Sequence, residues 1–212
     1  MLAEKPQWES LWEMNRLIII GASGHGKVVA DIARLCGYED IVFLDGDASV
    51  KSCAGYPVIG LDSEASNFKG DIFVAIGNNT IRKRLMMENS GRFFPVLIHP
   101  SAIIAKETKI GKGSVIMAGA VVNSDASLGS GVIVNTCSSV DHDCQVGSYC
   151  HIAIGAHLSG SVILDDNVWV GAGAIISNNI SICPETTIGA GAVVVKDIRE
   201  SGIYIGVPAR RK

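Results

Sequence analysis

Three of the five histidines of this chain lie in one short stretch, VDHDCQVGSYCHIAIGAHLSG. His142 stands between Asp141 and Asp143, whereas His151 and His157 are six positions apart. A neutral imidazole that a carboxylate orients and makes more basic is the usual form of a general base. Three histidines are also enough to hold a catalytic zinc ion. The residue types allow both kinds of chemistry, and the fold around them must decide.

The segment that carries these histidines repeats an aliphatic residue at every sixth position. From Ile98 to Val194 each sixth residue is Ile, Leu or Val, without one insertion. The residue four positions further on is always small or β-branched, and the residue just after the aliphatic one is often Gly, Asn, Asp or Ala. The latter composition predicts a tight corner at that position. An α-helix cannot carry this pattern, because six residues rotate the side chain by about 600°.

The period of six predicts a left-handed parallel β-helix of about five to six coils. Three hexapeptides close one triangular coil, and each inward aliphatic side chain stacks on its equivalent about 4.8 Å away. Such a prism has flat outer faces on which further copies can pack. We therefore expect a homotrimer, with sites in the clefts between neighbouring prisms.

The preceding segment has a different pattern. LIIIGASGHGKVVADIARLCGYEDIVFLDGD reads as strand, glycine-rich turn, helix and strand, and KGDIFVAIGNN and TIRKRLMMENSG add a strand and a helix. This alternation predicts a small Rossmann-like βαβαβ domain. The expected organisation is an extension or upstream-domain tail over residues 1–14, the Rossmann-like domain over 15–95, and the β-helix with a C-terminal tail over 96–212.

The glycine-rich turn GASGHG lies where the first strand meets the first helix, so its backbone amides and the helix N-terminus can receive a phosphate group. Asp45 ends the second strand, at a distance suited to an acid that binds a ribose or a base edge. Gly77, after the third strand, lies at the same edge of the sheet. These features favour a nucleotide-diphosphate ligand. The alternative is that the glycines serve only a tight turn.

Composition excludes several classes of function. The formal charge of -3 gives no basic face for nucleic acid, and no apolar run approaches the length of a membrane helix. The first residues carry acids and do not read as a signal peptide. The six cysteines form no CxxC pair, which indicates reduced thiols in a soluble, cytoplasmic protein.

The motifs GASGHGKVV, FLDGD, AIGNNTIRK, VNTCSSVDHDC and GVPAR occur in this order around the hexapeptide repeats. In this combination the chain resembles the acetyltransferases of nucleotide-activated amino sugars. The nearest resemblance is to the N-acetyltransferases of the bacillosamine pathway, of the PglD type and including the acetyltransferase half of PglB. The sialic acid O-acetyltransferases of the NeuD type are similar more distantly. The resemblance covers nearly everything from Asn15 to Arg210.

The resemblance implies an acetyl-CoA-dependent N-acetyltransferase that acetylates the 4-amino group of a UDP-4-amino-4,6-dideoxy-N-acetyl sugar, as in UDP-N,N'-diacetylbacillosamine synthesis. The implied catalytic residues are His142, as general base, and Asp143, which orients it. The implied acetyl-CoA contacts are His151, Ala172 and Ala190, and Arg210 and Arg211 carry charge suited to CoA phosphates. The implied contacts to the UDP-sugar are Ser23, Gly24, His25, Asp45 and Gly77. No metal is expected.

The resemblance also bears on partners. In fused relatives a membrane-bound sugar-phosphate transferase precedes this domain, which would explain residues 1–14 and would place the protein at the inner face of the membrane. Three alternatives to the N-acetyltransferase stay open: a sialic-acid-type O-acetyltransferase, a zinc enzyme of the prism type that uses His142, His151 and His157, and a non-catalytic nucleotide-sugar scaffold.

Overall fold

The computed structural model describes residues 16–212, so the extension predicted for residues 1–14 lies outside the described part. The chain divides into two compact units. The first comprises the described residues up to Ile76 together with Leu85–Pro95, and the second comprises Gly77–Arg84 and Val96–Lys212. Each unit is described by itself.

The first unit contains a twisted five-stranded sheet in the order β3-β4-β2-β1-β5. Its strands are β1 (Arg16–Ile20), β2 (Asp40–Leu44), β3 (Ser52–Cys53), β4 (Tyr56–Gly60) and β5 (Asp71–Val74). Strands β5, β1, β2 and β4 run parallel, whereas β3 pairs antiparallel with β4. The predicted Rossmann-like core of β1, β2 and β5 is confirmed. The β3–β4 hairpin extends it at one edge and was not predicted.

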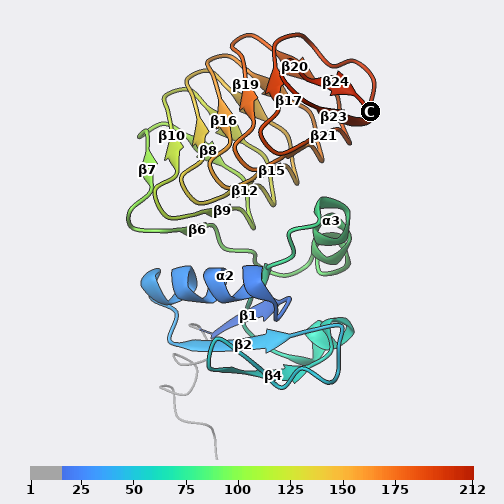
Figure 1. Ribbon diagram of the computed structural model, residues 1–212. Coiled ribbons are helices and arrows are strands. Elements are labelled where there is room, and N and C mark those ends of the chain that lie inside the picture. Colours follow the sequence, from blue (N-terminus) through green and yellow to red (C-terminus); the bar gives the residue numbers. More distant parts are fainter. Residues whose placement is uncertain (1–15) are drawn as a thin grey trace, which may run out of the picture. The chain divides into compact units, whose positions relative to one another are not determined.

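Strands β1, β2 and β5 are buried from their second residue onward, as the core of a Rossmann-like sheet requires. Helix α2 (Gly24–Leu35) follows β1, a short 3₁₀ helix η1 (Asp62–Asn67) precedes β5, and α3 (Asn79–Glu88) follows it. In Figure 1 α2 lies against the sheet formed by β1 and β2. Its inward residues Val29, Ile32 and Ala33 are almost fully buried. Helix α3 begins in the second unit and ends in the first.

The second unit is a left-handed parallel β-helix, which confirms the fold predicted from the period of six. Two-residue strands form three ladders that Figure 1 shows stacked along the prism. The first ladder, sheet C, contains β6 (Leu97–Ile98), β9 (Val115–Ile116), β12 (Ile133–Val134), β15 (His151–Ile152), β18 (Trp169–Val170) and β21 (Thr187–Ile188). Sheet D contains β7 (Ile103–Ile104), β10 (Val121–Val122), β13 (Ser139–Val140), β16 (His157–Leu158), β19 (Ile175–Ile176) and β22 (Val193–Val194). Sheet E contains β8 (Lys109–Ile110), β11 (Ser127–Leu128), β14 (Gln145–Val146), β17 (Ile163–Leu164) and β20 (Ser181–Ile182).

One coil of the prism holds eighteen residues. Val140 pairs in parallel with Val122 and with Leu158, eighteen positions before and after it. The inward aliphatic residues from Ile116 to Val194 are all buried, and so are the small residues four positions after each of them. Ile98, at the open first coil, is partly exposed. Side chains of equivalent residues therefore lie one above another on successive coils.

The tight corner of each hexapeptide lies two residues later than the composition predicted. Positive φ recurs every six residues from Gly113 to Gly191, at the third residue after each aliphatic position and not at the first. The occupants include Cys137 (φ 55°), Asp143 (φ 61°) and Tyr149 (φ 61°). Glycine at the first position has another cause. A Cβ at Gly147 would lie 2.6 Å from backbone atoms of the next coil, so that position is restricted by the close approach of the chains.

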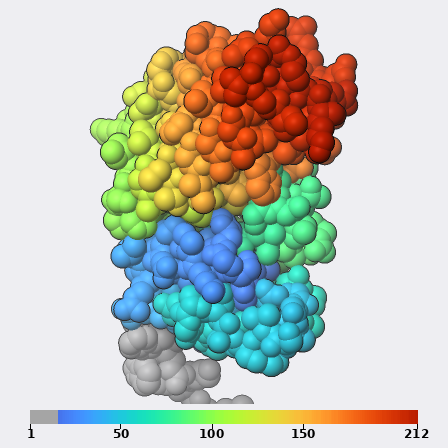
Figure 2. Space-filling model, in the orientation of Figure 1, coloured from blue at the N-terminus to red at the C-terminus, as the bar shows by residue number. Residues whose placement is uncertain are grey.

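The C-terminal residues close the last coil. Strand β23 (Ile203–Ile205) continues sheet C after β21, and β24 (Arg210–Arg211) pairs antiparallel with β23. Figure 2 shows this segment in red over the end of the orange coils. Within residues 16–212 no helix has the length and apolar character needed to cross a bilayer.

Candidate functional site

His142 lies at an open corner of the prism, between sheets D and E. Its side chain is 59% exposed, and its Nδ1 atom lies 2.7 Å from Oδ2 of Asp143. A carboxylate only accepts hydrogen bonds, so Nδ1 carries the proton and Nε2 is left with its lone pair. Among the described residues Nε2 has no hydrogen-bond partner. In its neutral form the imidazole thus presents a basic Nε2 at the surface of the prism.

The second acid beside His142 supports the corner and also acts on the imidazole. Asp141 Oδ1 accepts hydrogen bonds from the backbone N–H of His142 (2.8 Å) and from Asn123 Nδ2 (2.7 Å), one coil earlier. These bonds lower the pKa of Asp141, Asn123 contributing most. The hydrogen bond to Asp143 and then the charge of Asp141 raise the pKa of His142 above its ordinary value. The sequence did not single out Asn123, although the spacing of eighteen between Asn123 and Asp141 indicates it once the coil length is known.

His151 lies on sheet C in a different environment. It is 6% exposed, its Nδ1 is 3.3 Å from the carbonyl oxygen of Gly77, and its Nε2 is 3.1 Å from Asn135 Nδ2. Nδ1 therefore donates and Nε2 accepts, which describes a neutral ring. The ring also packs on Trp169, with centroids 4.7 Å apart. Both nitrogens are thus engaged within the chain, and the predicted contact of His151 with acetyl-CoA stays a prediction.

His157 lies on sheet D, where its Nδ1 is 2.9 Å from Ser139 Oγ. Within one chain, His142 therefore lies at a corner, His151 on sheet C and His157 on sheet D. Among residues 16–212 no group of three or more His, Cys, Asp or Glu side chains is arranged to hold a metal ion. The zinc alternative has no convergent ligand set in the described part of a single chain.

A buried arginine that the sequence did not reveal holds Gly77 in the second unit. Arg82 is 1% exposed, and its guanidinium donates hydrogen bonds to five oxygens of that unit. The acceptors are the carbonyl oxygens of Gly131 (2.8 Å), Gly77 (3.0 Å), Tyr149 (2.7 Å) and Cys150 (3.3 Å) and Oδ1 of Asn79 (2.9 Å). Burial lowers the pKa of Arg82 to about 10, so it stays charged at neutral pH. This network fixes the segment Gly77–Arg84 on the coils.

In the glycine-rich turn of the first unit, packing explains why residues 21 and 26 are glycine but does not explain why residue 24 is glycine. A Cβ at Gly26 would lie 2.1 Å from the carbonyl oxygen of Gly21, and Gly21 has a φ of 112°. These two glycines are required by the turn itself. At Gly24, by contrast, a Cβ would meet nothing within 4 Å. Ser23 is the N-cap of α2, yet its side chain makes no capping hydrogen bond. Gly24 and Ser23 thus leave an open surface at the helix N-terminus, beside His25.

Asp45 fixes the shape of this turn. Its Oδ2 accepts a hydrogen bond from the backbone N–H of Ala22 (2.6 Å), and its Oδ1 accepts one from the N–H of Asp47 (2.9 Å). Each oxygen can still accept one further hydrogen bond. The structure therefore gives Asp45 a role in shaping the loop, and its predicted contact with a nucleotide stays a prediction.

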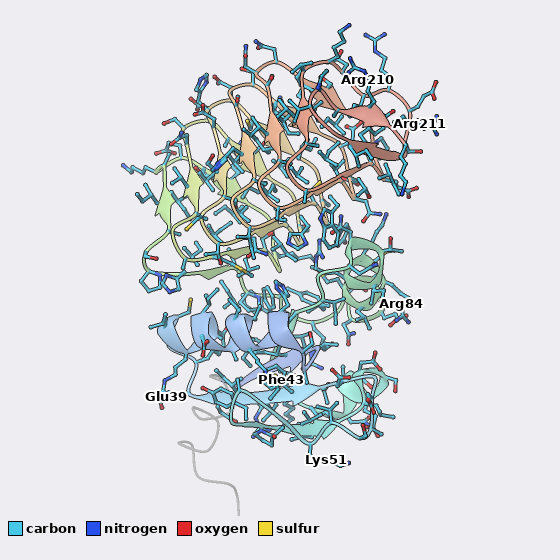
Figure 3. All side chains as sticks on the ribbon, viewed as in Figure 1. Glu39, Phe43, Lys51, Arg84, Arg210 and Arg211 are labelled. Carbon is cyan, nitrogen blue, oxygen red and sulfur yellow. The ribbon has the colours of Figure 1, made fainter. Side chains whose placement is uncertain are left out.

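Ala172 and Ala190 lie one coil apart on an exposed corner between sheets C and D. This corner is not the one that bears His142. Arg210 and Arg211 lie at the C-terminal end of the prism (Figure 3). Arg211 is bonded to Glu200 Oε2 (2.7 Å), whereas Arg210 Nη1 reaches only the neighbouring carbonyl oxygen of Ala209 (2.9 Å).

The cysteines inside the prism are unsuited to nucleophilic chemistry. Cys144 and Cys150 are buried at inward positions, and their thiols donate to the carbonyl oxygens of Ser159 (3.2 Å) and Asp165 (3.0 Å). Burial raises the pKa of both thiols, that of Cys150 to about 12. A thiol with a raised pKa supplies little thiolate, which is the reactive form.

Grooves mark the outer surface of the prism, and two of them contain residues of sheet E. The larger, of 680 Å³, runs along sheet E past Gln145, Ile163 and Asp166 and does not include His142. A smaller one, of 350 Å³, is lined by Asp143 together with Asp125 and Lys109. Neither lining includes His142, but the smaller groove reaches Asp143, the hydrogen-bond partner of that histidine.

Comparison with known proteins agrees with this geometry. Residues 16–89 match the family model of the PglD N-terminal domain. The acetyltransferase domain of PglB from Neisseria gonorrhoeae FA1090 is 43% identical, with a TM-score of 0.90, over 93% of this chain and 100% of that one. PerB from Caulobacter crescentus, solved with CoA and GDP-perosamine, is 36% identical, with a TM-score of 0.87, over 92% of this chain and 96% of that one. The UDP-N-acetylbacillosamine N-acetyltransferase of Bacillus subtilis (strain 168) is 36% identical over 116 residues, 50% of this chain and 52% of that relative, so the match spans about half of that relative's length.

A Rossmann-like unit that matches the PglD N-terminal domain, joined to a left-handed β-helix, places the chain among the β-helix acetyltransferases represented by the PglB domain. The identity to the PglB domain extends over that entire domain. The chain belongs to the family of sugar N-acetyltransferases that includes the acetyltransferase domain of PglB and the perosamine N-acetyltransferase PerB.

Proposed function

We propose that the protein transfers the acetyl group of acetyl-CoA to the 4-amino group of a UDP-4-amino-4,6-dideoxy-N-acetyl sugar. The observation that carries this proposal is the 2.7 Å contact between His142 Nδ1 and Asp143 Oδ2 at an open corner of the prism. Support for the two substrates comes from relatives: the PglB domain has been solved with acetyl coenzyme A, and the B. subtilis relative is named for UDP-N-acetylbacillosamine.

The reaction needs a base, because the nitrogen of the sugar amine must lose a proton as it forms the new C–N bond. The amine attacks the thioester carbonyl, and Nε2 of His142 takes the proton from the nitrogen. When the tetrahedral intermediate collapses, the C–S bond breaks and the proton passes to the departing thiolate. The products are the sugar amide and CoA. Asp143 holds the proton on Nδ1 and stabilises the imidazolium that forms between the two steps.

The nucleotide is proposed to bind at the glycine-rich turn of the first unit. The N–H groups in the first turn of an α-helix have no intrahelical acceptor and can receive phosphate oxygens, and the helix dipole favours negative charge there. Gly24 leaves the backbone open to close approach, and the hydroxyl of Ser23 is not used as a cap. His25 and Asp45 complete this proposed UDP contact, and Gly77 the contact to the sugar.

Acetyl-CoA is proposed to bind along the prism, with Ala172 and Ala190 contacting the pantetheine arm through their backbone. Support comes from the exposure of both alanines at one corner on successive coils. Since that corner is not the corner of His142, one chain by itself does not bring the two together. A groove between two copies would do so, which supports the proposed homotrimer.

The outer face of sheet D also supports self-association. Ile103 is 67% exposed and Ile175 is 42% exposed, and both project from this face together with Val121 and Val193. Aliphatic side chains gathered on a flat sheet favour contact with a second apolar face. The molar mass from light scattering should be three times the chain mass of 22.3 kDa. The use of acetyl-CoA supports a cytoplasmic location.

One assay tests the activity. Purified protein, acetyl-CoA and a panel of UDP-amino sugars are mixed, thiol release is followed, and the product is identified by mass spectrometry and NMR. Acetylation at nitrogen 4 supports the proposal. A sialic acid is assayed in parallel, and its O-acetylation without acetylation of any amine would identify the protein as an O-acetyltransferase instead. His142→Ala should lower kcat by about a hundredfold or more. His157→Ala is the matched control, because that histidine is also exposed but pairs with Ser139.

A further inference from the structure

Gly160 lies directly after His142 along the axis of the prism, eighteen residues further in the chain. The same corner position is occupied by Ser124 and His142 on the two preceding coils and by Asn178 on the following coil, and all three carry side chains. The φ of Gly160 does not lie in the left-handed region, which begins one residue later at Ser161. Neither the backbone conformation nor the corner therefore requires a glycine at 160.

The surroundings of Gly160 show what a side chain there would displace. A Cβ built on Gly160 would lie 2.6 Å from Cε1 and 2.6 Å from Nε2 of His142, and 3.3 Å from its Cδ2. The imidazole thus fills the volume that a methyl group would occupy. The backbone around the position makes ordinary contacts between coils: Ser161 N–H donates to the carbonyl oxygen of His142 (2.9 Å), and Asn179 N–H donates to that of Gly160 (3.0 Å). Any residue could make these bonds.

We infer that Gly160 is a positioning residue for His142: its missing side chain provides the seat in which the imidazole lies with Nδ1 against Asp143. This inference rests on the proposed function only in so far as His142 is the base of that reaction. The seat matters because His142 is otherwise exposed and can rotate about its side-chain bonds. A ring that lies close against Gly160 has fewer alternative orientations than a ring in solvent, so Nε2 points in one direction.

An alanine at 160 would compete with the ring for this volume. The atoms that must move belong to the end of an exposed side chain, so the ring can turn away while the coil stays intact. The cost would then appear in the hydrogen bond to Asp143 and in the direction of Nε2. A misplacement of about 1 Å at a reacting group can lower the rate by about a hundredfold.

The seat can be tested without substrate. The titration of His142 is followed by NMR in the wild type and in Gly160→Ala. Asp143 and Asp141 are the charged groups that act on this imidazole, and both remain in the variant. If the ring leaves Asp143, the pKa of His142 falls toward 6.5, whereas an unchanged titration overturns the inference. Gly91→Ala is the matched control, because a Cβ there meets nothing within 4 Å, and it should leave the titration unchanged.

A double-mutant cycle tests the functional consequence. Gly160→Ala should lower kcat by about tenfold or more in the wild type, and should cause no further loss when His142 is already alanine. Equal losses in the two backgrounds would show that Gly160 acts without His142 and would overturn the inference. If His142→Ala retains full activity, the proposed function fails, while the NMR titration still decides whether the seat exists.

The same variants cover the case in which Gly160→Ala does not fold. A collision with the ring is relieved when the ring is removed, so Gly160→Ala/His142→Ala should then recover the thermal transition of His142→Ala. If the double variant also fails to fold, position 160 needs glycine for the coil itself and the inference is wrong.

Discussion

Asp143 meets His142 across 2.7 Å because Asp143 adopts the left-handed conformation, with a φ of 61°. Two neighbours in an extended strand point to opposite faces and cannot pair in this way. The corner of the prism turns the chain between them and brings both side chains to one side. The proposed catalytic pair therefore depends on the corner that recurs every six residues in the prism.

The pH dependence of the reaction should follow this pair. A general base must be neutral, so kcat/KM should rise with pH through the pKa of His142, which lies above 6.5 in the free enzyme. Asp143→Asn removes the main cause of the raised pKa. The rising limb should therefore move to lower pH, and the maximal rate should fall by about tenfold or more because the imidazole is less basic.

Asparagine is the suitable replacement at 143, because it tolerates positive φ better than other side chains do. Asp141→Asn serves as a comparison and should shift the limb less, since the charge of Asp141 is the smaller cause. A pH profile of Asp143→Asn that coincides with that of the wild type would show that the pair does not set the titration of the base.

Two glycines of the nucleotide turn should respond differently to alanine. Gly26→Ala places a Cβ 2.1 Å from the carbonyl oxygen of Gly21 and 3.1 Å from the ring of Phe43, so the free energy of unfolding should fall by about 1–3 kcal/mol. Gly24→Ala meets nothing and should change that free energy by less than about 0.5 kcal/mol. Urea unfolding of both variants measures this difference.

Gly24→Ala should nevertheless weaken the binding of UDP by about tenfold, because the methyl group stands where a phosphate would approach the backbone. Isothermal titration calorimetry with UDP provides the measurement. Wild-type affinity in this variant would mean that the nucleotide does not contact the start of α2.

Arg82 should be a major contributor to stability. Arg82→Met removes all five of these hydrogen bonds from a buried position, and the free energy of unfolding should fall by about 3 kcal/mol. Arg82→Lys should recover only part of this loss, since one ammonium group cannot reach all five acceptors. Lys83→Met removes the neighbouring cation, which lies over the ring of Tyr149, and should cost less than about 1 kcal/mol. Denaturant unfolding of the three variants should separate these effects, and equal stabilities of Arg82→Met and wild type would contradict the role.

The reactivity of the cysteine thiols should depend on their burial. Cys36 and Cys137 are exposed and should react with a thiol reagent in the native protein. Cys53, Cys144 and Cys150 are buried with raised pKa values and should react only after unfolding in urea. Mass spectrometry after brief labelling identifies the modified residues. Rapid labelling of Cys144 would show that the coil opens at the corner of His142.

The residues of the prism show which structural features could be predicted from the sequence. An aliphatic side chain at every sixth residue permits only one stacking of the coils. The inward positions from Ile116 to Val194 were therefore predictable, and so was the burial of Cys144, which lies four positions after Val140. The pairing of His142 with Asp143 was also predictable from the resemblance. The conformation of the corner was not, because Gly, Asn and Asp occur at two positions of the hexapeptide for two different reasons. One position adopts positive φ, whereas at the other glycine leaves room for the next coil and Asn123 and Asp141 make side-chain hydrogen bonds.

The sequence alone therefore determined the repeat, the inward residues and the acid-flanked histidine, since each depends on the order of residues along the chain. The tertiary structure decided what those residues touch. Gly160 beneath the ring of His142, Asn123 against Asp141 and the five acceptors around Arg82 depend on distances between coils and on side-chain rotamers. Periodicity specifies which residues become neighbours, whereas contact depends on how the neighbouring side chains fill the space between them.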